Sequence, residues 1–313
     1  MKRRDFIHSS LAATATVFAS RLSAADAPAS APATPAAPPA TPTEFKPLRR
    51  DVGYFTGRGG TIGWLANKDA LMGIDTQYPD TAAAFYQGLP GRGDRHLDVV
   101  LNTHHHGDHT SGNLFLKPLA KTIVAHANVP KLQFAAAERA GSLDRQAYAD
   151  TTFASVWRRD LGDETAISQY HGVGHTSGDV VTLFEKANVI HMGDLMFNRI
   201  YPVIDRASGG SIRNWIVVLE EVHQTYPADA LYIFGHGLAK FGPTGTRADL
   251  LIFRDYLTGL LDHVQKRIAA GESKEKISTL ENLPGFTDFH TPLPNRLGAN
   301  LAAAYDELTE KKV

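Results

Sequence analysis

Apolar and polar positions along the chain alternate in runs that predict short strands and amphipathic helices. Between Gly53 and Asp75, apolar runs at 61–66 and 70–74 flank a polar turn, a pattern that predicts a β-hairpin ending at Asp75. A second hairpin is expected over 180–191. Further strands are expected at 98–102, 122–125 and 231–234, and helices at 81–89, 131–149, 247–269 and after the capping residue Ser211.

Both halves of this region contain strands and helices, which suggests two sheets packed together with helices outside. The region from about Phe45 to Val313 is long enough for one substantial α/β domain. We therefore expect residues 46–313 to form a single α/β domain that ends in helices.

The N-terminal segment has the pattern of an export signal. Arg3 and Arg4 form a twin-arginine pair, a short apolar stretch covers 11–20, and small residues at 23–25 offer a cleavage site. We expect residues 1–25 to be a twin-arginine signal and the Ala/Pro/Thr-rich residues 26–45 to be a disordered tether. The expected partner is the twin-arginine export machinery and the expected location is the periplasm. A cytosolic amphipathic N-terminus is the alternative.

Composition excludes several classes of function. The chain has no cysteine, which rules out disulfides, thiolate ligands and a cysteine nucleophile. The formal net charge is −1, and residues 1–25 carry a net +3, so the remainder carries about −4. Nothing in this balance indicates nucleic-acid binding, and no later segment is long and apolar enough for stable membrane insertion. A small-molecule substrate is therefore expected, whereas the oligomeric state is left open.

The run from His104 to His109 contains the pattern His-x-His-x-Asp-His, which suits two metal ions. Side chains two apart on an extended segment point the same way, so His104 and His106 can face one ion. Asp108 and His109, after a turn at Gly107, can reach a second ion. Imidazole and carboxylate suit zinc. An adventitious histidine tract is the alternative, but such a tract would have no reason to follow a buried strand.

Three more polar residues stand where a strand meets a glycine-containing loop: His175, Asp194 and His236. Loops at strand ends are where a site can converge, and neighbouring glycines let the backbone approach an ion. Any one of them alone is more typical of a structural residue. Their order after the histidine motif favours a metal site.

At this point the chain resembles the metallo-β-lactamase superfamily, over about residues 53–240. The resemblance implies a four-layer αβ/βα sandwich of two mixed sheets flanked by helices, with two metal ions at one edge. It implies that His104, His106 and His175 bind the first ion, that Asp108, His109 and His236 bind the second, and that Asp194 bridges both. It also implies that Asp75 supports the site without binding a metal ion directly.

The resemblance implies a dinuclear zinc hydrolase that opens a lactone, ester or amide bond, and the N-terminal signal implies that it is exported; iron or manganese stay open as alternatives to zinc. In such a site, two metal ions lower the pKa of a shared water toward neutrality. Asp108 is the expected catalytic residue, because it can orient that water and carry its proton. A glutathione thioester is not the expected substrate, since the chain after Ala239 does not resemble the glutathione-binding end of glyoxalase II.

Three other functions remain as alternatives: β-lactamase activity, a mononuclear iron dioxygenase, and a non-catalytic metal- or substrate-binding protein. Asp194 argues against the first, because the zinc β-lactamases we compare lack a bridging aspartate there. The second set of ligands argues against a mononuclear site. Whether Tyr201, His191 or Asp179 assists the site is left open. Specificity is expected to depend on the loops 54–60 and 198–211.

Overall fold

One mixed sheet of seven strands forms the first half of the molecule. The structure is a computed structural model that describes residues 42–291 and 293–310, so the expected signal and most of the tether lie outside the described residues. The strands lie in chain order from one edge to the other. They are β1 (Glu44–Arg49), β2 (Val52–Thr56), β3 (Ile62–Ala66), β4 (Leu71–Ile74), β5 (Val99–Asn102), β6 (Ile123–His126) and β7 (Thr151–Phe153). Strands β1 to β4 are antiparallel neighbours, and β4 to β7 are parallel.

A second mixed sheet of six strands has the order β15-β13-β11-β10-β9-β8. Its strands are β8 (Val156–Leu161), β9 (Glu164–Gln169), β10 (Val181–Phe184), β11 (Val189–His191), β13 (Leu231–Ile233) and β15 (Thr244–Gly245). Only β11 and β13 pair in parallel among these neighbours in the described chain. A short parallel pair, β12 (Phe197–Asn198) and β14 (His236–Gly237), lies beside the second sheet.

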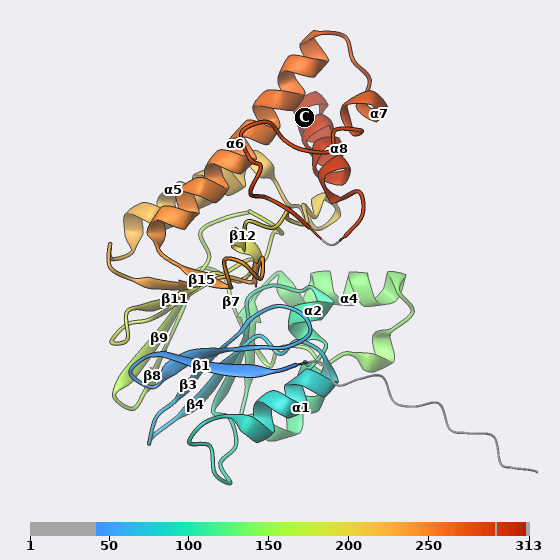
Figure 1. Ribbon diagram of the computed structural model, residues 1–313. Coiled ribbons are helices and arrows are strands. Elements are labelled where there is room, and N and C mark those ends of the chain that lie inside the picture. The colour runs from blue at the N-terminus through green and yellow to red at the C-terminus, as the bar shows by residue number, and fades with distance from the viewer. Residues whose placement is uncertain (1–41, 292, 311–313) are drawn as a thin grey trace, which may run out of the picture. The chain divides into compact units, whose positions relative to one another are not determined.

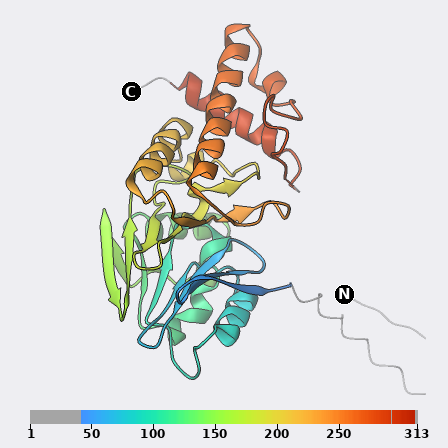
Figure 2. The same ribbon diagram turned by 60° about the vertical axis from the view of Figure 1, so that its left-hand side comes forward.

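Helices cover the outer faces of both sheets, as Figures 1 and 2 show. The first half carries α1 (Pro79–Gly88), α2 (Gly107–Thr110), α3 (Asn113–Leu116) and α4 (Val129–Arg139). The second half carries α5 (Ile212–Thr225), α6 (Arg247–Ala269), α7 (Lys274–Ile277) and α8 (Arg296–Thr309). Single 3₁₀ turns lie at Lys117–Leu119, Leu143–Arg145, Gly193–Leu195 and Arg206–Ser208.

Three apolar clusters define four layers. The central cluster joins the inner faces of the two sheets, with Val52, Leu101, Phe184 and Ile233 among its members. A second cluster packs α1 against the first sheet, and a third packs α5, α6 and α8 against the second. Burial of these apolar side chains is the main favourable contribution to folding. The observed arrangement is the mixed-sheet α/β sandwich that the sequence predicts.

Most of the predicted elements are present, with one error of extent. Both hairpins form, Ser211 accepts a hydrogen bond from the Asn214 N–H as the N-cap of α5, and α6 spans the expected residues. The helix expected over 131–149 is wrong in length, because α4 ends at Arg139. Gly141 has a φ of 60°, a left-handed conformation that ends a helix and that glycine adopts without strain.

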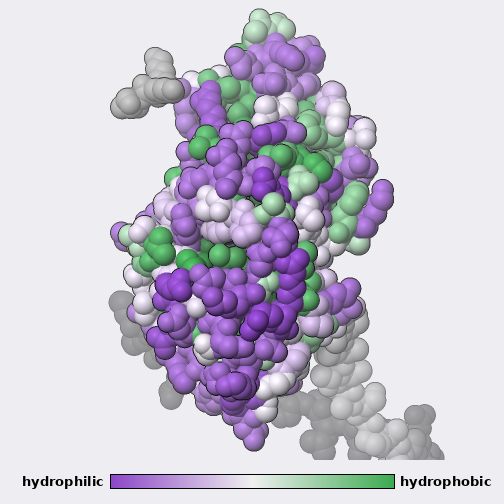
Figure 3. Space-filling view, turned by 90° about the vertical axis from the view of Figure 1, so that its left-hand side faces the viewer, coloured by the Kyte–Doolittle hydropathy of each residue, from purple (hydrophilic) through white to green (hydrophobic). Residues whose placement is uncertain are grey.

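The side of the molecule on which β8 and α5 lie is mostly hydrophilic, with apolar residues in small separate areas (Figure 3). Strand β8 is an edge strand of the second sheet and exposes Arg158, Arg159 and Asp160. Charged side chains on an edge strand oppose pairing with another chain. No helix in the described ranges has both the length and the apolar character needed to span a bilayer.

Candidate metal centre

The loop after β5 carries the histidine motif, and Asp75 holds that loop in place. Asp75 follows β4 with a φ of 66°, a conformation that is uncommon outside glycine. Its carboxylate accepts hydrogen bonds from the Thr103 N–H, the Thr103 hydroxyl and His109 Nδ1, each at 2.8 Å. Because β4 and β5 are parallel neighbours, their ends lie together. Asp75 therefore occupies the supporting position that the resemblance implies.

The first group of candidate ligands is His104, His106 and His175. His106 Nδ1 lies 2.9 Å from His175 Nε2, and His104 Nε2 is buried with no hydrogen-bond partner among the described residues. His175 Nδ1 donates to the Val203 carbonyl at 2.7 Å, which leaves its Nε2 lone pair directed into the group. His106 Nε2 donates to Asp205 Oδ2 at 2.9 Å, which leaves its Nδ1 available.

The second group is Asp108, His109 and His236. Asp108 and His109 lie in the first turn of α2, and His236 lies in β14. Asp108 Oδ2 is 3.1 Å from His236 Nε2 and 3.6 Å from His109 Nε2, and the two Nε2 atoms are 3.3 Å apart. The hydrogen bond from His109 Nδ1 to Asp75 orients the ring, so that Nε2 points toward the other two residues.

The Asp194 carboxylate lies between the two groups. Its Oδ2 is 3.8 Å from His104 Nε2 and 3.5 Å from His175 Nε2. Its Oδ1 is 3.1 Å from His109 Nε2 and 3.4 Å from His236 Nε2. Each oxygen thus faces one group, which is the arrangement of a carboxylate that bridges two ions. All seven residues selected from the sequence meet in one place.

The electrostatics of the two groups differ. Burial, together with the neighbouring His106, lowers the pKa of His175 to about 3, and burial lowers the pKa of His104 well below its ordinary value. Burial acts in the same direction on His236, but Asp194 and Asp108 outweigh it and raise that pKa to about 9. His104 and His175 therefore offer neutral nitrogen lone pairs, and the second group concentrates carboxylate charge that attracts cations.

Burial alone would raise the pKa of Asp108 and of Asp194. For Asp108, the charge of His109 and the hydrogen bond with His236 outweigh burial and hold the pKa at about 2. For Asp194, the charges of His236 and His109 hold the pKa well below its ordinary value. Both carboxylates are therefore ionised at neutral pH, as metal ligands must be.

The donor atoms fit zinc. One atom from each of His104, His106, His175 and Asp194 lies within 4.8 Å of the others, and the second group meets the same limit. Four tetrahedral ligands with bonds of about 2.0 Å lie about 3.3 Å apart. The interatomic distances given above straddle that spacing. In the part of the chain that the structure describes, the buried His104 Nε2 and Asp194 Oδ1 make no hydrogen bond of good geometry, which is further evidence because a buried polar atom without a partner is costly.

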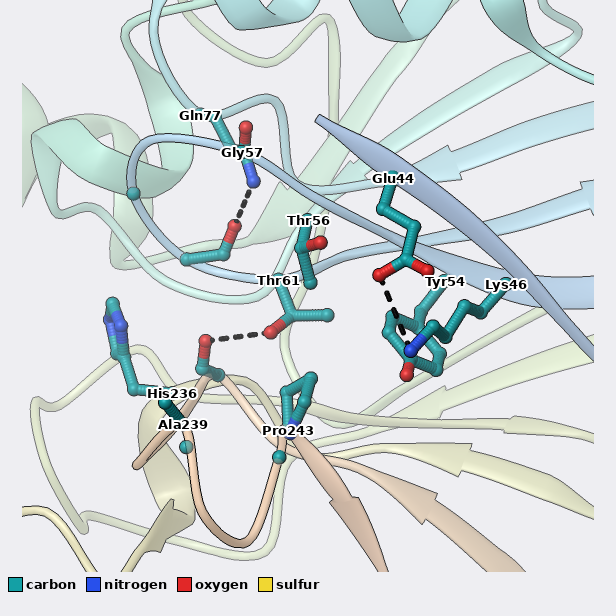
Figure 4. A pocket seen from close by; sticks show the side chains of 15 residues that line it. Glu44, Lys46, Tyr54, Thr56, Gly57, Thr61, Gln77, His236, Ala239 and Pro243 are labelled. Carbon is teal, nitrogen blue, oxygen red and sulfur yellow. Dashed lines mark hydrogen bonds and ion pairs between the residues drawn. The ribbon is translucent and has the colours of Figure 1, made fainter. Parts of the chain in front are cut away.

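Glycines let the backbone lie close to these side chains. A Cβ on Gly60 would overlap the His109 ring, and a Cβ on Gly235 would overlap Asp194 Oδ1. The two glycine loops are tied together, since the Thr61 hydroxyl donates to the Gly235 carbonyl at 3.0 Å. Figure 4 shows this contact and the cavity of about 470 Å³ beside His236 that these loops surround.

A second cavity, of about 210 Å³, opens directly on the candidate ligands. His106, Asp108, Asp194 and His236 line it, together with apolar and polar residues of other elements: Phe197, Ile200, Tyr201, Val203, Thr291, Leu293 and Arg296. Both loops expected to set specificity border a cavity. Gly57, Gly59 and Gly60 line the first, and residues 200, 201 and 203 line the second. Tyr201 lines the second cavity, but its hydroxyl is buried, and burial raises its pKa.

The other singled-out residues have structural contacts. His191 Nε2 donates to the Thr61 carbonyl, and Nδ1 accepts from the Gly193 N–H. His191 therefore holds two loops in place rather than orienting a candidate ligand. Within the described ranges Asp179 makes no hydrogen bond to His175; it accepts two from Thr176, from the N–H and the hydroxyl, both at 2.7 Å. His105 points away from the ligands, with Nε2 at 3.1 Å from Ser208 Oγ.

Asp205 is the residue that the sequence analysis missed. It contacts His106 and belongs to the loop 198–211, whose Asp-containing turn was the available signal. The Asp205 carboxylate also accepts a hydrogen bond from the Ser208 N–H, which fixes its position. Burial would raise the pKa of Asp205, but the hydrogen bond with His106 outweighs burial and lowers it strongly.

Comparison with known proteins identifies the family. A family model described as the metallo-beta-lactamase superfamily matches residues 33–245, most of the chain. The chain belongs to this superfamily. The resemblance inferred from the sequence is thus confirmed, and membership together with the site supports a metal-dependent hydrolase.

Individual relatives share the fold at low identity. A metallo-beta-lactamase from Pontibacter korlensis has a TM-score of 0.57 and 17% identity, covering 69% of this chain and 99% of that chain. The stereoselective inverting sec-alkylsulfatase from Pseudomonas sp. has a TM-score of 0.62 and 16% identity, covering 83% of this chain and 49% of that chain. At this identity, both matches show the fold alone.

A sequence relative is the hydroxyacylglutathione hydrolase of Methylococcus capsulatus. It is 35% identical over 119 residues, which are 38% of this chain and 41% of the relative. The chain therefore matches less than half of that protein, so the match does not show that this chain has the relative's activity.

Proposed function

We propose that the protein is a dinuclear zinc hydrolase that opens a lactone, ester or amide bond. The observation that carries the proposal is the position of Asp194, with one carboxylate oxygen facing each histidine group. A mononuclear site would not need the second group of candidate ligands, Asp108, His109 and His236. This argues against the iron dioxygenase alternative.

In the proposed enzyme, His104, His106 and His175 would hold one zinc ion, Asp108, His109 and His236 would hold the other, and Asp194 would supply a ligand to each. Bound zinc would lower the pKa of a water toward neutrality and polarise the substrate carbonyl. Asp108 is 28% exposed at its side chain, the most open of the carboxylates at the centre, and it is ionised. It can therefore accept a proton from the attacking water and return it to the leaving group.

The buried rings around the centre restrict how the substrate enters. Phe197 stacks on the His236 ring at 5.3 Å between centroids, and it borders the cavity of about 210 Å³. Apolar walls exclude competing water and strengthen the electrostatic interactions inside the site. A cavity of this size suits a small substrate, since sites for drug-sized ligands occupy about 300–1,000 Å³.

Metal analysis followed by a hydrolase panel tests the proposal. We expect about two zinc ions per chain and turnover on esters, lactones, amides, β-lactams or thioesters. Asp108→Ala should lower kcat by roughly 10²–10⁴-fold with the fold retained. The control is Asp144→Ala, because Asp144 is exposed and lies in a separate 3₁₀ turn.

Three outcomes would contradict the proposal. Iron with oxygen uptake would favour the dioxygenase. Tight zinc binding without turnover on any substrate would favour a non-catalytic binding protein. Unchanged turnover in Asp108→Ala would show that Asp108 is not a catalytic residue. The thioester is in the panel because the hydroxyacylglutathione hydrolase matches part of the chain.

We also propose export to the periplasm by the twin-arginine pathway, on the basis of Arg3, Arg4 and the apolar stretch that follows. Because that pathway carries folded proteins, zinc could be bound before export. Replacing both arginines by lysine should retain the protein in the cytoplasm, as measured by cell fractionation. Equal periplasmic amounts of both proteins would contradict the proposal.

A further inference from the structure

The segment between α7 and α8 forms one wall of the candidate active site, although it lies beyond the residues that the family model matches. His290 holds this segment against the loop 198–211. The His290 N–H donates to the Arg199 carbonyl at 3.0 Å, and the His290 carbonyl accepts from the Tyr201 N–H at 3.2 Å. As a result, Thr291, Leu293 and Arg296 line the same cavity as the candidate metal ligands.

This cavity combines apolar walls with one cation. Phe197, Ile200, Val203 and Leu293 supply the apolar lining, and Arg296 is the one lysine or arginine among the described lining residues. Other arginines of this region have carboxylate partners: Arg199 lies 3.7 Å from Asp249, and Arg206 lies 3.2 Å from Glu307. Within the described ranges, Arg296 has no such partner.

Arg296 lies where the cavity meets a wider one of about 660 Å³. The two cavities share four lining residues, Tyr201, Thr291, Leu293 and Arg296. Leu297 and Gly298, in the first turn of α8, also line the wider cavity. The N-cap residue Asn295 makes no side-chain cap hydrogen bond, so the first N–H groups of this helix stay available near Arg296.

Carboxylates elsewhere on the wider cavity limit where an anion can bind. Glu275 and Glu281 line it, and both are exposed. They oppose an anion on that side, whereas Arg296 and the start of α8 attract one at the junction of the two cavities. A guanidinium presents a planar fork that matches an oxyanion such as a carboxylate.

We propose that Arg296 is a specificity-determining residue that binds an oxyanion group of the substrate, such as a carboxylate, several atoms away from the bond at the metal centre. The intervening carbon atoms lie against Ile200 and Leu293. This inference rests on the proposed function, because it places the reacting bond at the metal centre. It narrows the substrate class to small anionic esters, lactones or amides.

Binding of linear carboxylic acids to the zinc-loaded protein tests this inference. Each dicarboxylate from succinate to suberate is compared by calorimetry with the monocarboxylate of equal carbon number. One carboxylate can bind at the metal centre in both probes, so the difference reports the remote group. At the best chain length, we expect the dicarboxylate to bind roughly 10-fold more tightly. Arg296→Ala should abolish that preference, and Arg296→Lys should retain part of it.

Arg158→Ala is the matched control, because Arg158 is exposed on β8, away from both cavities. Zinc content should be equal in all variants, which shows that the fold is intact. Equal binding of both acids at every length, or a preference that survives in Arg296→Ala, would overturn the inference whatever the hydrolytic activity. An Arg296-dependent preference without turnover on the hydrolase panel would overturn the proposed function and leave the anion site standing.

Discussion

His106, His109 and His175 each have a second partner that selects which ring nitrogen faces the candidate metal centre. His109 and His175 donate through Nδ1, to Asp75 and the Val203 carbonyl, and present Nε2. His106 does the reverse, because its Nε2 donates to Asp205. Partners of this kind fix the tautomer and the ring orientation. The sequence indicates the ligands, but it does not indicate these atoms, because the partners come from distant segments.

Removal of the Asp205 carboxylate should weaken zinc binding. In Asp205→Ala, His106 loses the acceptor that holds its ring, and we expect the affinity for zinc to fall by roughly 10–100-fold. Competition with a chromogenic chelator measures this change. Asp205→Asn is the matched control: it keeps one acceptor oxygen, which can serve either His106 or the Ser208 N–H but not both, and it should retain part of the affinity. Unchanged zinc affinity in Asp205→Ala would show that His106 needs no support.

At the scale of elements, buried strands and long helices are the elements that can be predicted from the spacing of apolar residues. The hairpin of β3 and β4 and the long α6 follow from local periodicity, and both match the structure. The edge strands β1 and β8 were not predicted. Strand β8 exposes Arg158, Arg159 and Asp160, and β1 contains Pro47, because an edge strand has only one neighbour and needs no apolar alternation.

Strand ends explain why the residues of the candidate metal centre could be selected from the sequence. His104 follows β5, Asp194 follows β11 and His236 follows β13. Parallel neighbours, β4 with β5 and β11 with β13, bring such ends to one edge of each sheet. By contrast, the wall formed by Leu293 and Arg296 lies in an irregular segment without periodicity, and only its packing against the loop 198–211 brings it to the site.

At the scale of the molecule, the candidate metal centre joins the two halves of the sandwich. The first sheet supplies Asp75 and the histidine motif, and loops of the second supply His175, Asp194 and His236. The central apolar cluster holds the sheets together by burial, which is non-directional. The ligands add directional contacts across the same junction. Bound zinc should therefore stabilise the whole fold.

Removal of zinc by a chelator should lower the melting temperature. An ion present at about 1,000 times its Kd stabilises the folded state by about 4 kcal/mol, and for a domain of this size the loss corresponds to roughly 10 °C. Differential scanning calorimetry with and without the chelator measures the shift. Zinc should restore the higher Tm, whereas magnesium should not, because it prefers oxygen ligands. In Asp194→Ala the chelator should have a smaller effect, since both ligand groups lose their shared carboxylate. Equal melting temperatures with and without zinc would mean that the seven side chains do not hold a metal that links the two sheets.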